Sequence, residues 1–258
     1  MSVLQQNGHT ASSSSAEEGT GGRSRAVAVF CGSSLGNQQA FEHAATSIGH
    51  ALARTSRPLV YGGGSKGIMG VVSGATLDAG GSVTGVVPEA MIIASPQSGK
   101  AISSEGQGEV KGVILNESAH ENMEQIVVKS MHERKVEMAR RVGAFVGLPG
   151  GYGTFEELME VVTWTQIGIH SKPVVLVNVL GFYSSLRELV QTAVRSGFIK
   201  EENVDLLVFV DGPSDQSQHS TFDWGSATLE AIDAWSPPTG TGFGFKWSTT
   251  NENSLSRT

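Results

Sequence analysis

The chain has 258 residues, 39% of them hydrophobic, which is enough for one α/β domain with a sizeable core. Its formal net charge of −7, without a basic stripe carrying interleaved aromatic residues, argues against a nucleic-acid partner. The single cysteine, Cys31, excludes an intrachain disulfide and suits a reducing compartment.

The two ends of the chain differ in composition from its centre. Residues 1–25 are rich in Ser and Gly and nearly devoid of large apolar groups, so we expect a disordered N-terminal tail. This stretch has neither the apolar core of a signal peptide nor a membrane span, so we expect a cytoplasmic protein without a membrane partner. Residues 236–258 are expected to form a flexible C-terminal tail, in which Phe243, Phe245 and Trp247 could dock locally.

Between the tails, residues 26–235 alternate short apolar runs with longer helical patterns. Strands of four to six residues followed by helices of ten or more are typical of parallel β-α units, and continuous Val/Ile/Leu runs are typical of strands buried on both faces. We therefore predict an α/β fold, a doubly wound, mostly parallel, Rossmann-like sheet in a single domain. The predicted strands are 26–30, 58–61, 82–87, 143–148, 173–178 and 206–210. The predicted helices are 38–54, 67–78, one from the loop after 148 to about 169, 183–196 and one within 222–235.

One segment, from Pro88 to about Ala119, breaks this rhythm. It has no clean period and is long for a compact domain, so it is a functional lid, an insertion or an ordinary variable surface loop. The stretch VKGVILN inside it could add a strand.

Three predicted strand ends carry loops of small residues, at 31–34, 62–67 and 149–154. Parallel α/β sheets bind ligands outside the carboxyl ends of their strands. Glycine lets backbone N–H groups approach a phosphate, and the helix that follows adds a partial positive charge. Each loop alone is compatible with a tight turn, but three together predict a phosphate-binding edge.

The second loop supports a rival interpretation. Gly62, Gly64 and Gly67 match the G-x-G-x-x-G fingerprint of dinucleotide-binding folds, after a strand and at the start of a helix. Glu89 lies 22 residues beyond Gly67, where an acid that binds ribose would be expected. An oxidoreductase that binds NAD(P) therefore stays open.

A charged helix in SMHERKVEMARR precedes the third loop. Arg134 and Lys135 could point at the same ligand as the glycine loops, since both side chains suit phosphate binding. The alternative is a solvated helix with ion pairs four residues apart. The histidines, including His132 and His170, are isolated and no metal-ligand spacing is present, so we expect no metal and no cofactor.

These motifs together resemble one family. SMHERK, LPGGYGTFEEL, FCGSS and YGGGSKGIMG are similar to the LONELY GUY family of cytokinin riboside 5′-monophosphate phosphoribohydrolases. The family pattern P-G-G-x-G-T-x-x-E matches from Pro149 to Glu157 without a gap, and the resemblance covers about residues 26 to 235. The family was long labelled lysine decarboxylase, but the sequence lacks a stretch typical of a Schiff-base lysine.

The resemblance implies cleavage of the N-glycosidic bond of cytokinin riboside 5′-monophosphates, and of AMP, into free base and ribose 5-phosphate. It implies Arg134 and Glu157 as catalytic residues, with the 5′-phosphate on the loop from Gly150 to Thr154. The implied substrate-binding residues are Gly32, Ser33, Gly63, Gly64, Met131, Lys135, Gly150, Gly151, Tyr152, Gly153, Thr154, Phe155, Glu156, Glu160 and Thr163. A carrier that binds nucleotides without catalysis remains the second alternative.

The helix EELMEVVTW is apolar around most of its circumference, so it must be buried on most sides. Another helix of the same chain or a second subunit could cover it. The resemblance implies the second subunit, in a homodimer or a larger assembly of dimers with sites at the interface.

Overall fold

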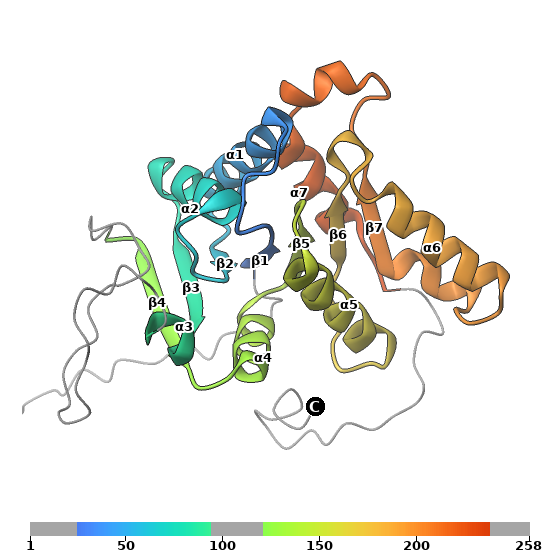
Figure 1. Cartoon of the computed structure of the whole chain (residues 1–258), viewed down its shortest axis with the longest axis horizontal. Helices are drawn as coiled ribbons and strands as arrows, with labels where there is room; N and C mark the ends of the chain where they lie inside the picture. Colours follow the sequence, from blue (N-terminus) through green and yellow to red (C-terminus); the bar gives the residue numbers. More distant parts are fainter. Residues whose placement is uncertain (1–24, 94–120, 238–258) are drawn as a thin grey trace, which may run out of the picture.

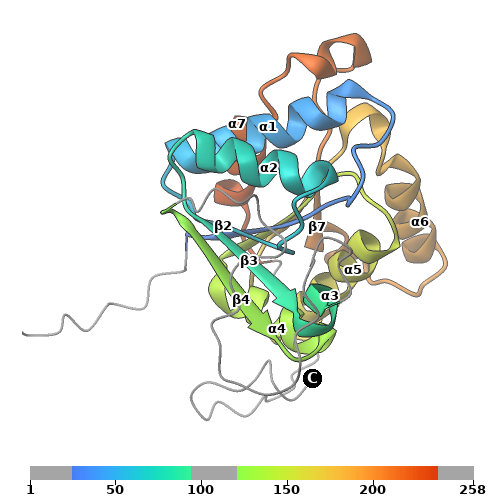
Figure 2. The same cartoon turned by 60° about the vertical axis from the view of Figure 1, so that its left-hand side comes forward.

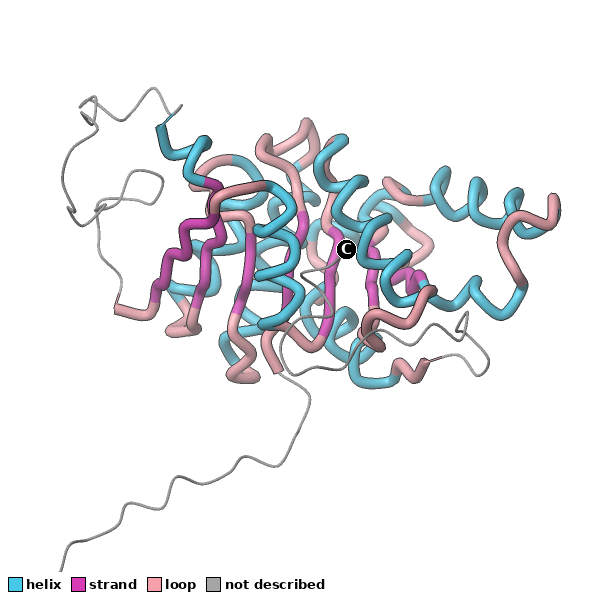
Figure 3. Tube along the Cα trace, turned by 90° about the horizontal axis from the view of Figure 1, so that it is seen from below, coloured by secondary structure: helices cyan, strands magenta, loops and turns pink. Residues whose placement is uncertain are grey.

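The computed structural model describes residues 25–93 and 121–237, and their centre is one parallel sheet of seven strands (Figure 1). The strands are β1 Val27–Phe30, β2 Leu59–Tyr61, β3 Val83–Pro88, β4 Met123–Val128, β5 Ala144–Gly147, β6 Val174–Val177 and β7 Leu207–Val210. They lie in the order β4-β3-β2-β1-β5-β6-β7, and every neighbouring pair is parallel. Figure 3 shows them side by side across the molecule. The predicted doubly wound α/β fold is confirmed.

Helices cover both faces of this sheet (Figures 1 and 2). The α-helices are α1 Gln39–Arg54, α2 Gly67–Asp78, α3 Glu89–Ile93, α4 Met131–Arg141, α5 Tyr152–Gln166, α6 Ser184–Arg195 and α7 Trp224–Ala234. The 3₁₀ helices are η1 Val179–Gly181, η2 Glu201–Leu206 and η3 Gln216–Ser220. On one face, α1, α2 and α7 pack over a core that includes Val27 and Val29. On the other, α4 and α5 pack over Ala28 and Phe30, because successive strand residues point to opposite faces.

The segment from 88 to 119 begins differently from the expectation. Residues Glu89–Ile93 form the short helix α3, and Pro88 is the last residue of β3, where it is opposite Val128. The stretch VKGVILN lies outside the described residues, as do the expected tails apart from Arg25 and residues 236–237.

Strand β4 was not among the predicted strands. It is an edge strand of sequence MEQIVV, and only its last residue, Val128, is buried. An edge strand that is half exposed does not need the continuous apolar run that marks the central strands, which is why the pattern missed it.

The order in which strands are added to the sheet reverses beside β1. From β1 the chain steps outward through β2 and β3 to β4, and then returns to the other side of β1 as β5. The carboxyl ends of β1 and β5 therefore flank the crevice where doubly wound sheets bind their ligands. The first glycine loop begins directly after β1, at Cys31, and the third begins at Pro149, with only Leu148 between it and β5.

Candidate functional site

The three glycine loops meet at this crevice. The backbone N–H of Gly32 in the first loop donates a hydrogen bond to the carbonyl of Pro149 in the third, at 3.1 Å. Gly67 in the second loop has φ +62, and a Cβ there would lie 2.3 Å from the carbonyl carbon of Ser33. A side chain at position 67 is therefore excluded by both conformation and space. The loops form one continuous edge, as the expectation of a shared site requires.

The amino end of α5 is open toward this edge. Helix α5 begins after Gly151, which provides no side-chain cap, and the first helical hydrogen bond runs from the N–H of Phe155 to the carbonyl of Gly151. The N–H groups of residues 152–154 precede that bond, as the free donors at a helix start do. An added Cβ would meet nothing within 4 Å at Gly151 or Gly153. Free donors, open space and the positive end of the helix dipole are what an anion such as phosphate needs.

Gly150 allows the third glycine loop to pack closely against Thr154 and the first glycine loop. A Cβ at position 150 would lie 2.2 Å from Oγ1 of Thr154 and 2.8 Å from the N of Gly32. Thr154 is itself buried, with 4% of its surface exposed. The loop is held from behind by Tyr183, whose hydroxyl donates a 2.7 Å hydrogen bond to the carbonyl of Leu148.

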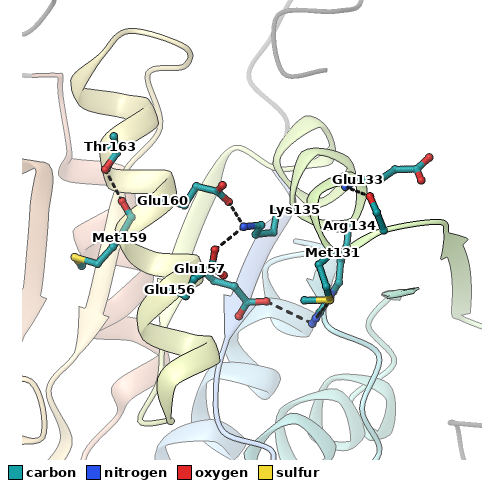
Figure 4. Close-up of polar contacts among 10 residues, drawn as sticks. Met131, Glu133, Arg134, Lys135, Glu156, Glu157, Met159, Glu160 and Thr163 are labelled. Atoms are coloured by element: carbon teal, nitrogen blue, oxygen red, sulfur yellow. Dashed lines mark hydrogen bonds and ion pairs between the residues drawn. The ribbon is translucent and has the colours of Figure 1, made fainter. Parts of the chain in front are cut away.

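Arg134 of α4 and Glu157 of α5 face each other beside the loops (Figure 4). Nη2 of Arg134 lies 3.5 Å from Oε1 of Glu157, and each side chain is only 10% exposed. Helix α4 starts at the N-cap Ser130, whose Oγ accepts from the N–H of Glu133, and the Glu133 carboxylate accepts from the N–H of Lys129 just before the cap. This start fixes Arg134, five residues after Lys129, on the first turn of α4.

The guanidinium of Arg134 fits there because residue 62 is glycine. A Cβ at Gly62 would lie 2.0 Å from Nη2 of Arg134. Nε of Arg134 is buried and has no hydrogen-bond partner among the described residues. A buried guanidinium donor without a partner is costly, so it is a candidate donor to a bound ligand.

The environment of Glu157 moves its ionisation close to neutrality. Burial is the main cause that raises the pKa of this carboxyl from 4.5 to about 7; Arg134 and Lys135 oppose the rise, and Glu156 and Glu160 add to it. Cys31 lies close enough that the charge of Glu157 adds to burial in raising the pKa of its thiol. A carboxyl that titrates near pH 7 suits an acid or base in catalysis.

Lys135 is engaged differently from its neighbour. Its ammonium lies 2.5 Å from Oε1 of Glu156 and 2.9 Å from Oε2 of Glu160, both on α5 (Figure 4). Lys135 was expected to bind the ligand together with Arg134. In the structure its ammonium pairs instead with the carboxylates of Glu156 and Glu160, which were also expected to bind the substrate.

The remaining expected residues fall into two groups. Near the pair and the loops lie Met131, whose sulfur is 3.8 Å from Nη1 of Arg134, and residues Gly32, Ser33, Gly63, Gly64 and 150–154. Two others point elsewhere. Phe155 lies with its ring 6.2 Å from that of Phe182, and Thr163 lies further along α5, where its hydroxyl donates to the Met159 carbonyl at 2.8 Å (Figure 4).

Sequence reasoning missed three residues that shape the site. Gly62 was noted as part of a fingerprint and a glycine loop, Cys31 as a lone thiol at the start of the first glycine loop, and Tyr183 as the start of a helix, but none was named as a site residue. Each acts through a contact between segments far apart in the chain, which spacing alone does not show.

Within residues 25–93 and 121–237, no group of three or more His, Cys, Asp or Glu side chains is placed to hold a metal ion. In the same ranges no helix has the length and apolar character needed to cross a bilayer.

Several known proteins have similar sequences or structures. Residues 69–219 match the family model described as "Possible lysine decarboxylase". Cytokinin riboside 5′-monophosphate phosphoribohydrolase LOG2 of Arabidopsis thaliana is 46% identical over 191 residues, which span 74% of this chain and 80% of that protein. Probable cytokinin riboside 5′-monophosphate phosphoribohydrolase LOGL9 of Oryza sativa subsp. japonica is 46% identical over 193 residues, spanning 74% and 76%. Among solved structures, the molybdenum cofactor carrier protein MCP from Chlamydomonas reinhardtii has a TM-score of 0.49 at 18% identity, covering 80% of this chain and 97% of its own.

Proposed function

The chain belongs to the family of cytokinin riboside 5′-monophosphate phosphoribohydrolases, and we propose that it hydrolyses the N-glycosidic bond of such nucleotides and of AMP. The products are a free adenine-type base and ribose 5-phosphate. The observation that carries this proposal is the buried Arg134–Glu157 pair beside the open amino end of α5. An acid of raised pKa and a guanidinium whose Nε has no hydrogen-bond partner among the described residues support the proposal, because both lie beside the N–H donors that would hold a phosphate.

In this proposal the protein recognises its substrate mainly through the 5′-phosphate. It binds to the N–H groups at the start of α5, and the Thr154 hydroxyl adds a donor from below. These donors are fixed before the ligand arrives, because the contacts of Gly150 with Thr154 and Gly32 leave the loop little freedom. The ribose then reaches toward Glu157, one helical turn from the phosphate.

The chemistry follows from the two facing side chains. Water adds to C1′ of the ribose as the bond from C1′ to the base nitrogen breaks, and the base leaves with the electron pair and takes up a proton. The transition state has oxocarbenium character, which the Glu157 carboxylate stabilises or exploits by activating the water. Arg134 stabilises the charge on the leaving base or positions the ribosyl phosphate.

The dinucleotide alternative is weakened by what the glycines contact. Gly62 makes room for Arg134, Gly64 lies against Met69, and Gly67 lies against Ser33. The fingerprint also follows β2, whereas the strand order reverses between β1 and β5, which is where a dinucleotide would be expected to bind. Packing between the loops therefore accounts for these glycines without a bound dinucleotide.

The direct test is to incubate the protein with AMP and with isopentenyladenosine monophosphate and to separate the free base by chromatography. Release of base by the wild type, and its loss in Glu157→Gln, is the expected result. Binding of AMP without release of base would favour the carrier, and quenching or enhancement of NAD(P)H fluorescence on binding would favour the oxidoreductase.

We also propose that the protein is a cytoplasmic homodimer, or a larger assembly of dimers, in which α5 lies at the interface. Leu158, Val161 and Trp164 of α5 are buried within the chain, whereas Met159 and Val162 are only partly buried and Thr163 is exposed. A second subunit at this face would bury the side chains of Met159 and Val162 and bring Thr163 near a substrate site at the interface.

A further inference from the structure

Two ionic links join α4 to α5 at adjacent residues. Arg134 faces Glu157, and the next residue, Lys135, lies between Glu156 and Glu160 (Figure 4). We propose that Lys135 is a positioning residue, which acts through Glu156 and Glu160 on Glu157 and does not contact the substrate. This inference rests on the hydrolysis proposed above and assigns Lys135 a role within that site.

The geometry supports a mechanical role first. Adjacent residues of a helix point about 100° apart, so two links at adjacent positions fix the rotation of α4 against α5 as well as their distance. The Lys135 side chain is 12% exposed and Glu160 is 23% exposed, so their link is sheltered more than an ordinary surface pair. Without Lys135, only the first of these two links, the 3.5 Å contact between Arg134 and Glu157, would remain.

The charges support an electrostatic role as well. The groups that face Glu157 are Arg134 and Lys135 from α4, Glu156 and Glu160 from α5, and the thiol of Cys31 at the end of β1. Three carboxylates thus share two cations. Glu156 and Glu160 raise the pKa of Glu157 and Lys135 lowers it, so removal of Lys135 alone leaves two uncompensated anions beside Glu157.

The competing role for Lys135 is direct binding of the substrate phosphate. Its ammonium has three N–H donors, and the two neighbouring carboxylates already accept from it at 2.5 and 2.9 Å. A phosphate would have to approach a cation that two anions already neutralise. The free N–H groups of α5 meet no such competition.

The test compares three variants with the wild type in steady-state kinetics on AMP across pH 5 to 9. For Lys135→Met we expect kcat to fall by about tenfold or more with KM changed by less than about threefold, which is the pattern of a lost transition-state geometry. The acid limb of kcat/KM should move to higher pH. Lys135→Arg keeps the charge between the carboxylates and should retain most of kcat.

The decisive variant removes the whole cluster. In Lys135→Met combined with Glu156→Gln and Glu160→Gln, the two anions leave together with the cation, so the acid limb should return toward its wild-type position and kcat should partly recover. If Lys135→Met instead raises KM for AMP at unchanged kcat, or if the combined variant is less active than Lys135→Met, the inference is wrong. Arg141→Met is the matched control, because Arg141, at the far end of the same helix, pairs with Glu137 of α4 and Glu124 of β4.

A second readout separates this inference from the proposed hydrolysis. The Glu157 carboxyl can be titrated by ¹³C NMR in the wild type, in Lys135→Met and in the combined variant, and assigned by its loss in Glu157→Gln. The order of midpoints should be Lys135→Met highest and the combined variant close to wild type. If the wild type releases no base but this order holds, hydrolysis fails and the coupling stands; equal midpoints in all three overturn the coupling whatever the activity.

Discussion

The Arg134 guanidinium and the Glu157 carboxylate lie 3.5 Å apart where each side chain is about nine-tenths buried. Burial disfavours both charges, and the cation offsets only part of the cost to the anion, so the pKa of Glu157 lies at about 7. The pair is therefore adjusted for proton chemistry near neutral pH more than for stability.

Glu157→Gln should abolish most activity without unfolding the protein. The amide has nearly the same shape, but it neither stabilises an oxocarbenium-like sugar nor activates water. We expect kcat for AMP to fall by about 10²–10³-fold. Circular dichroism should be unchanged. Glu188→Gln, at an exposed glutamate of α6, serves as the control, and activity of Glu157→Gln within threefold of the wild type would exclude its catalytic role.

The stability of the wild type should depend on pH through Glu157. Its pKa is about 7 in the fold against an ordinary 4.5, so the folded state holds this proton more tightly than the unfolded state. The stability that it contributes is fully present below about pH 4.5 and is lost as pH rises through 7. Between pH 5 and 8 the wild type should lose on the order of 2–3 kcal/mol more than Glu157→Gln, by urea unfolding at both pH values. Parallel pH dependences of the two proteins would contradict the burial of this carboxyl.

Gly62→Ala should separate activity from stability. The added methyl group would lie 2.0 Å from Nη2 of Arg134, which is the far end of a flexible side chain, so the guanidinium moves and the fold stays. A displacement of about 1 Å from Glu157 should cost about 10²-fold in kcat. Gly74→Ala is the matched control, since a Cβ there meets nothing within 4 Å inside α2. It should leave kcat unchanged and raise the free energy of unfolding by about 0.5–1 kcal/mol. Equal activity of Gly62→Ala and Gly74→Ala would argue against a catalytic Arg134.

The sequence predicted the meeting of the glycine loops because one rule suffices for it: the carboxyl ends of parallel strands share one edge. It did not predict the partners of Lys135, because the pairing of α4 with α5 depends on how the two helices are rotated. Residue type and spacing suggested that Arg134 and Lys135 act together, and only the packed structure separates them. Gly62 was found as a motif, but its contact with Arg134 joins residues that are 72 positions apart (134 − 62).

The 5′-phosphate should dominate substrate choice. The donors at the start of α5 have no partner in a nucleoside, whereas a phosphate would accept several charge-assisted hydrogen bonds from them. Together these are worth at least about 3 kcal/mol, so kcat/KM for adenosine should be about 100-fold or more below that for AMP. Ribose 5-phosphate should inhibit the hydrolysis of AMP, and ribose at the same concentration should not. Comparable turnover of AMP and adenosine would show that the loops serve another purpose.

The last prediction concerns assembly through α5. Val162 is only partly buried within the chain and lies next to the exposed Thr163, so a charge placed there meets a partner if the proposed interface exists. A two-fold interface buries the same patch twice, so each dimer would feel two such charges. Light scattering should give at least about twice 27.1 kDa for the wild type, and Val162→Asp should shift the mass to the monomer and reduce kcat together. Leu189→Asp on α6, where the leucine is 64% exposed, is the matched control and should stay dimeric and active. A wild-type mass near 27.1 kDa at micromolar concentration would exclude the dimer, and dissociation by Leu189→Asp alone would move the interface to α6.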